Sequence, residues 1–344
     1  MLLFSRRLAP SNPILYLDNV QISLVPTHKH LGIILSKNGN WNAHIESIID
    51  KTSTKINLLR KFKYILDRKS LEIIYKTYIR PILEYADIVW GNTTEANDKA
   101  LEDLQLAALR IITGLPRGTS HYTILREAGF VKLALRRRNH RLTMFHNIIN
   151  GLAPSNLLTL APVRRHQLIR TNLRNRNNFT LINARTNAFA SSFLPHTIQE
   201  WNNLPPNIKL CTDPNAFKSL LGIRALIRPP LWYYVSVNRF IEICLTRMRH
   251  GASGLANDLF TNHIIDSPRC LCGELETADH YLIYCPMHIP ERITMIQNLS
   301  STNVPRNTIT TNLLTCGSPL LPLETNLNIF KAVQIYIRAT RRFV

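Results

Sequence analysis

The sequence is poor in acidic residues. Its 344 residues contain 22 Asp and Glu against 42 Lys and Arg, which gives a formal net charge of +20. No Asp or Glu occurs between residues 128 and 199, where the chain carries eleven basic residues. Net charge says nothing about fold, but this imbalance favours a polyanionic partner such as nucleic acid.

Cysteines and long apolar runs are also scarce. The six cysteines are unevenly spaced and no secretory signal peptide is evident, so we expect an intracellular protein of the nucleus or cytoplasm. No apolar run reaches the roughly 18 residues that a membrane span needs, and we expect no membrane partner. With 45% hydrophobic residues, the chain is globular and long enough for two or three domains.

Short β-strands are predicted in the first forty residues. Residues 14–17 and 20–24 are rich in strand formers and flank Asp18-Asn19, which predicts a hairpin with a two-residue turn. Residues 1–5 and 31–35 predict two further strands.

From Trp41 the apolar period changes from two to 3.6, which predicts helices. Ser70 is a candidate N-cap, and Pro81 is expected to kink or end the second helix near Ile79. Asp213 followed by Pro214 predicts the start of a short helix. The expected helices are residues 41–63, 70–85, 97–113, 131–150, 213–221, 231–249 and 326–342.

The stretch from Pro268 to Pro290 concentrates metal-binding residue types. Three thiolates and one imidazole would complete a closed, tetrahedral, structural zinc site. Gly273 permits a tight turn after the first pair, and the second pair spans about one helical turn or a strand-loop. The first gap is shorter than usual, so buried thiols beside a chance histidine are the alternative. The four candidate ligands are Cys270, Cys272, His280 and Cys285.

The acid-free span is dominated by arginine, with ten Arg and one Lys. A guanidinium binds phosphate bidentately, whereas lysine acts as a point charge. The alternative is a solvated helix face, although such faces normally mix both signs. The candidate nucleic-acid contacts, including two lysines on the first helix, are Lys51, Lys55, Arg136, Arg137, Arg138, Arg141, Arg164, Arg165, Arg170, Arg174 and Arg176.

Four stretches carry a family resemblance. They are His30-Leu31-Gly32-Ile33 with Trp41-Asn42-Ala43-His44-Ile45, the run from Ile74 to Ala86 with Val89-Trp90, Trp201-Asn202-Asn203-Leu204-Pro205, and the Cys270 to Cys285 run. In this order they resemble non-LTR (LINE-type, jockey-like) retrotransposon reverse transcriptases beyond the palm active site.

The resemblance implies a mainly α fold with a small N-terminal β remnant of a polymerase palm. It implies a palm remnant at 1–40, a helical thumb at 41–150, a basic linker at 151–186 and a C-terminal domain at 187–344, with a zinc knuckle at 268–290. In the family the thumb holds the template–primer duplex and the C-terminal region helps to bind RNA or target DNA, so RNA and DNA are the implied partners. Tyr281 and Tyr284 either stack on unpaired bases or belong to the core.

Catalytic carboxylates of the kind that the resemblance implies are not found in this sequence. Two-metal phosphoryl transfer needs palm aspartates, including a Tyr-x-Asp-Asp pair. Tyr16-Leu17-Asp18-Asn19 has one acid and fits a turn. We therefore expect no catalytic residue here, and magnesium only where the complete polymerase is present. The alternatives are part of an active enzyme whose palm is encoded upstream, or an inert relic; an exposed apolar face on residues 1–35 would favour the relic.

Overall fold

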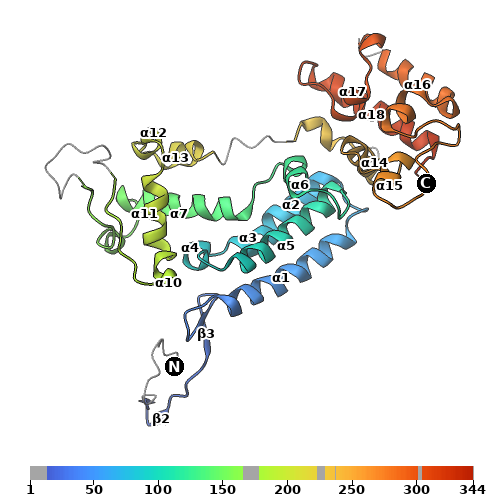
Figure 1. The fold of residues 1–344 in the computed structure, drawn as a ribbon. Coiled ribbons are helices and arrows are strands. Elements are labelled where there is room, and N and C mark those ends of the chain that lie inside the picture. Colours follow the sequence, from blue (N-terminus) through green and yellow to red (C-terminus); the bar gives the residue numbers. More distant parts are fainter. Residues whose placement is uncertain (1–13, 166–177, 223–228, 237, 301–303, 344) are drawn as a thin grey trace. The chain divides into compact units, whose positions relative to one another are not determined.

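A computed structural model describes residues 14–165, 178–222, 229–236, 238–300 and 304–343 of the chain. The chain divides into two compact units. Unit 1 comprises residues 1–54, 80–105 and 131–226, and unit 2 comprises residues 55–79, 106–130 and 227–344. Helices predominate, and the sheets of the described residues are two small hairpins (Figure 1), so the prediction of a mainly α fold is confirmed.

Two hairpins form the described N-terminal part of unit 1. β1 (Tyr16–Leu17) pairs with β2 (Val20–Gln21), and both turn residues have positive φ, 49° at Asp18 and 61° at Asn19. This confirms the predicted hairpin. β3 (Thr27–His30) pairs with β4 (Ile33–Ser36), so the third predicted strand also has a partner. The strand predicted at residues 1–5 lies outside the described residues.

Helices with one apolar face build the first core of unit 1. They are α1 (Asn42–Lys61), of which residues up to 54 belong here, α3 (Arg80–Glu84), α4 (Asp87–Trp90), α5 (Glu95–Thr113), of which residues up to 105 belong here, and α7 (Leu133–Ile149). The apolar period predicted α1, α5 and α7 to within two residues at nearly every end. Their contacts bury Ile45, Ile48, Leu83, Trp90, Leu101 and Leu133.

A second core of unit 1 lies on the C-terminal half of α7. It involves α11 (Phe193–Asn202) and α13 (Pro214–Leu220), and the Asp213 side chain accepts a hydrogen bond from the Ala216 N–H as predicted. Phe145, Trp201 and Phe217 are buried together, and Phe179 of the predicted linker joins them. The described ends of that linker are therefore part of the packed fold. Short helices α8 (Ser155–Leu158), α10 (Asn187–Ala190) and α12 (Pro206–Lys209) connect these elements.

Unit 2 combines short helices from the middle of the chain with its C-terminal part. The middle segments supply α2 (Arg68–Ile74), the π-helical turn η1 (Tyr75–Ile79) and α6 (His121–Ala128). The C-terminal part supplies η2 (Leu231–Tyr234), α14 (Arg239–Arg249), α15 (Ala256–Thr261), η3 (His280–Tyr284), η4 (Pro286–His288), α16 (Ile289–Ser300), η5 (Arg306–Thr308), α17 (Thr311–Cys316) and α18 (Leu323–Thr340). α16 and α18 lie side by side (Figure 1). Leu245, Leu282, Phe330 and Val333 are among the buried residues that form the core of the C-terminal part.

Two helix predictions need correction. Ser70 is not the N-cap of α2; Asp67 is, because its carboxylate accepts the Ser70 N–H at 2.6 Å. The helix expected over 231–249 is broken into η2 and α14, since the Asn238 side chain caps α14 by accepting the Phe240 N–H at 2.8 Å. The helix α6 was not predicted.

A π-helical turn precedes Pro81, at the place where the sequence predicted that the second helix kinks or ends. A proline has no N–H to donate to the fourth preceding carbonyl, and its ring clashes with that carbonyl. The chain widens into the π-helical turn η1 over Tyr75–Ile79, immediately before α3. Such π turns are a recognised cause of kinks in helices.

Candidate metal centre and nucleic-acid interface

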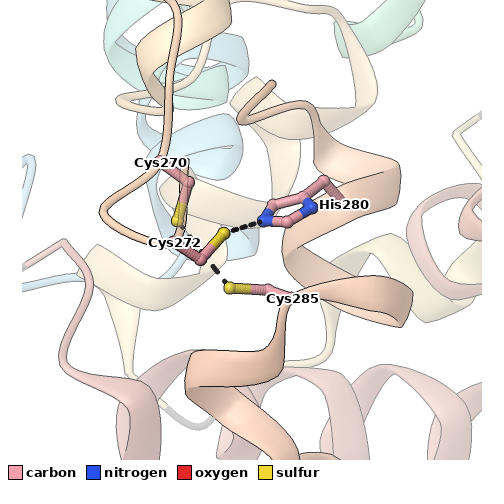
Figure 2. A group of neighbouring side chains, drawn as sticks. All are labelled: Cys270, Cys272, His280 and Cys285. Carbon is pink, nitrogen blue, oxygen red and sulfur yellow. Dashed lines mark hydrogen bonds between the residues drawn. The ribbon is translucent and has the colours of Figure 1, made fainter. Parts of the chain in front are cut away.

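Cys270, Cys272, His280 and Cys285 converge in unit 2 (Figure 2). Their ligand atoms all lie within 4.8 Å of one another. The Sγ atoms of Cys270 and Cys285 are 3.7 Å apart, and Cys272 Sγ is 3.2 Å from His280 Nε2. Zinc bonds of about 2.3 Å to sulfur and about 2.0 Å to nitrogen give a tetrahedron with edges of roughly 3.5–3.8 Å. The separation of the two Sγ atoms matches such an edge, so the four side chains could hold one metal ion.

Local sequence explains why these side chains meet. Gly273, at φ +95°, closes a turn in which its N–H donates to the Cys270 carbonyl at 2.9 Å. Across the cluster, the Cys285 N–H donates to the His280 carbonyl at 2.7 Å, which ends the π-helical turn η3. Both predicted features, the tight turn and the single helical turn, are confirmed.

The cluster is anchored to the C-terminal helices of unit 2. Glu276 accepts two hydrogen bonds of 2.6 Å from Arg342 and one of 2.6 Å from the Ala256 N–H. Burial opposes ionisation of Glu276, but these hydrogen bonds lower the pKa of its carboxyl below the ordinary value. The carboxylate thereby fixes the segment between the two ligand pairs.

The two tyrosines beside the cluster have different environments. Tyr281 is 1% exposed, and its hydroxyl lies 2.6 Å from Thr340 Oγ1. Burial raises the pKa of Tyr281 well above its ordinary value. Tyr281 therefore belongs to the core, whereas Tyr284 is 67% exposed and its ring is accessible.

The arginines of α7 face carboxylates that are distant in sequence. Arg137 Nη2 donates to Asp98 at 2.5 Å, and its guanidinium lies 5.8 Å from the centre of the Trp90 ring. Arg136 pairs with Glu84. Burial raises the pKa of the Asp98 carboxyl, and the positive charge of Arg137 opposes that shift.

Glu200 of α11 neutralises two further arginines of α7. Its carboxylate lies 3.1 Å from Arg141 Nη2 and 3.4 Å from Arg138 Nε. Arg137 and Arg141 are buried, so both side chains lie in the interior of unit 1. The span is free of acids in sequence, but the fold brings Glu84, Asp98 and Glu200 to it.

The other candidate contacts have mixed placements. Lys51 is exposed, and the Lys55 ammonium lies 4.6 Å from the centre of the Tyr78 ring. Arg164 is half-buried with its guanidinium 4.9 Å from the Phe179 ring centre, and the Arg165 N–H donates to the Asn178 carbonyl at 2.9 Å. Arg170, Arg174 and Arg176 lie outside the described residues.

A basic cavity in unit 2 was not anticipated as a whole. It has a volume of 480 Å³. The sequence showed that the end of α1 is basic, but the other cations come from distant segments. Its charged lining residues are Arg60, Lys63, Arg110, Arg117 and Arg247.

Two polymerases of Drosophila melanogaster transposons are similar to this chain. "Probable RNA-directed DNA polymerase from transposon BS" is 25% identical over 172 residues, or 46% of this chain and 18% of that protein. "Probable RNA-directed DNA polymerase from transposon X-element" is 23% identical over 180 residues, or 44% of this chain and 19% of that protein. The chain thus spans less than a fifth of the length of these curated relatives.

Other comparisons give no match. No protein-family model matches the chain, and no solved structure does. Among the described residues, no helix is both long enough and apolar enough to cross a membrane.

Proposed function

We propose that this chain binds RNA and DNA as part of a retrotransposon RNA-directed DNA polymerase. The similarity to two transposon polymerases carries the proposal. The net charge of +20 supports it, because neutralisation of phosphates by Lys and Arg supplies most of the sequence-independent affinity for nucleic acids. The buried ion pairs of α7 assign Arg137 and Arg141 a structural role and leave phosphate contact to the accessible cations.

We further propose that Cys270, Cys272, His280 and Cys285 bind one structural zinc ion. The spacing of the ligand atoms and the choice of three thiols and one imidazole support it. Four protein ligands leave no open position for a substrate or water. Zinc would hold the turn at 270–273 against η3, and it takes no part in a reaction.

The nucleic-acid proposal is tested by fluorescence anisotropy with labelled RNA, single-stranded DNA and duplex DNA. We expect binding that depends weakly on sequence, with log affinity falling linearly with log salt. Five or six phosphate contacts on duplex DNA would weaken binding about a thousandfold between 50 and 200 mM salt. A chain that binds none of the three at 50 mM salt would contradict the proposal.

The same chain is expected not to synthesise DNA. The one acid of Tyr16-Leu17-Asp18-Asn19 lies in a hairpin turn, and two bridging metal ions need further carboxylates. Primer extension with template, deoxynucleotides and magnesium should give no product. Extension that disappears in Asp18→Ala would overturn this assignment.

An inert relic is the second candidate, and one observation favours it. Tyr16, Leu17, Val20 and Leu31 of the N-terminal hairpins are all more than half exposed. Apolar strands without a covering layer are typical aggregation sites. A relic should unfold without cooperativity and bind no nucleic acid, whereas a functional segment should unfold cooperatively and bind.

A further inference from the structure

The basic cavity of unit 2 gathers five cations from separate elements. Arg60 lies in the last turn of α1 and Lys63 follows it, Arg110 lies in the last turn of α5, Arg117 follows α5, and Arg247 lies in α14. The other lining residues are Ala107, Ile111, Leu115 and Pro116, so no acid lines the cavity in the described part of the chain.

Three of these cations contact neutral groups. Arg247 Nε donates to the Gly114 carbonyl at 2.8 Å, which leaves the two terminal nitrogens of its guanidinium for another acceptor. Arg60 Nη1 donates to Asn57 at 3.2 Å, and the Lys63 ammonium lies 4.9 Å from the Tyr64 ring centre. Arg110 Nε is buried and has no hydrogen-bond partner in the described structure.

Four other arginines of unit 2 pair with carboxylates. Arg68 and Arg249 lie on Glu127, Arg239 pairs with Glu242 at 2.6 Å, and Arg342 pairs with Glu276. The chain has few acids, and it places them on these arginines rather than on the cavity. The cavity therefore combines mutual repulsion of its cations with a buried donor that lacks an acceptor.

Helix dipoles explain only part of this arrangement. Arg60, Arg110 and Arg247 lie in last turns, where each helix end carries about half a negative charge. Three such ends offset roughly 1.5 of five positive charges. Lys63 and Arg117 lie beyond the helices, so a large positive excess is left for an external anion.

We propose that this cavity holds a phosphate group of a bound nucleic-acid strand, an inference that rests on the proposed function. Guanidinium forks match phosphate oxygens bidentately. The cavity volume lies in the usual range for ligand sites, and its apolar wall suits the adjoining sugar. The five cations exceed the charge of a single phosphate group, which favours a strand with several phosphates over one small phosphate.

The test compares two variants that lose the same charge. Lys63→Gln with Arg117→Gln alters the cavity, and Arg126→Gln with Lys331→Gln removes two exposed cations elsewhere in unit 2. Each is titrated with labelled duplex DNA over a salt series. The cavity variant should lower the salt slope by about 1.8 and weaken binding about 60-fold at 0.1 M salt. The control should lie close to the unaltered chain.

The outcomes separate this inference from the proposed function. If the unaltered chain binds DNA but both variants bind alike, the cavity assignment is wrong and the proposed function stands. If the unaltered chain binds no nucleic acid, the proposed function fails. The unaltered chain and both variants are then titrated with pyrophosphate, and binding is measured as a shift in the thermal unfolding temperature. If pyrophosphate raises the unfolding temperature of the unaltered chain but not of the cavity variant, the cavity binds small phosphates and the inference as stated is wrong. If all three proteins respond equally, the cavity is not a phosphate site.

Discussion

Glu127 of α6 is expected to be the most sensitive charged position in unit 2. Its carboxylate accepts hydrogen bonds of 2.7 Å from Arg68 of α2 and 2.7 Å from Arg249 of α14, and His250 Nε2 lies 2.9 Å away. The Glu127, Arg68 and Arg249 side chains are almost completely buried. Burial opposes ionisation of Glu127, but Arg249, Arg68 and His250 lower the pKa of its carboxyl below the ordinary value. One carboxylate thus links three helices.

The magnitude follows from what each partner loses in Glu127→Gln. Removing one member of a buried ion pair costs about 3–5 kcal/mol. Arg68 keeps Glu72 at 3.6 Å, while Arg249 keeps the Thr315 carbonyl at 2.7 Å and the Tyr233 ring at 3.5 Å but no carboxylate among the described residues. Glutamine retains the shape and one acceptor oxygen. We therefore expect a loss of about 3 kcal/mol in the free energy of unfolding.

The assay is urea unfolding followed by circular dichroism at pH 7. The matched control is Asp266→Asn, which removes an exposed carboxylate and should change stability by less than about 0.5 kcal/mol. Glu127→Gln with an equally small change would refute the assigned role of the cluster.

The same variant predicts a change in acid sensitivity. Because the folded pKa of Glu127 is depressed, its contribution is present above the unfolded pKa, near 4.5, and is lost as pH falls below that value. The unaltered chain should lose up to about 1.4 kcal/mol per pH unit more than Glu127→Gln below about pH 4.5. If the stability of both proteins falls equally with pH below about pH 4.5, the folded-state pKa of Glu127 is not depressed.

Two further predictions concern the metal centre and α7. Elemental analysis should find about one zinc per chain. Cys285→Ser should lose the zinc, whereas Cys211→Ser, which lies outside the cluster, should keep it. An unchanged zinc content in Cys285→Ser would refute the site. Arg137→Gln should destabilise the fold by about 2 kcal/mol, because its 2%-exposed guanidinium holds Asp98, with little change in the salt slope of DNA binding. A flattened slope with unchanged unfolding would place Arg137 at the nucleic-acid surface instead.

Local rules set much of this protein from sequence alone. Asp18-Asn19 tolerates the positive φ of a two-residue hairpin turn, the 3.6 period after Trp41 predicts α1, and Asp213 with Pro214 starts α13. The four candidate metal ligands could be selected because their spacing is short and each pair lies on one turn. All of these features depend on residues at most fifteen positions apart in the sequence.

Only the tertiary structure determined which cations pair with carboxylates. The span without acids predicted a phosphate-binding face, yet Glu84, Asp98 and Glu200 approach it from other segments and neutralise α7. The opposite occurs in unit 2, where cations separated by up to 187 positions, from Arg60 to Arg247, line one cavity that has no acid among its described lining residues. Coulomb energy depends on distance in space, and folding brings charges together or apart regardless of their separation along the chain. Composition therefore set the excess of positive charge, and only packing determined which cations are neutralised.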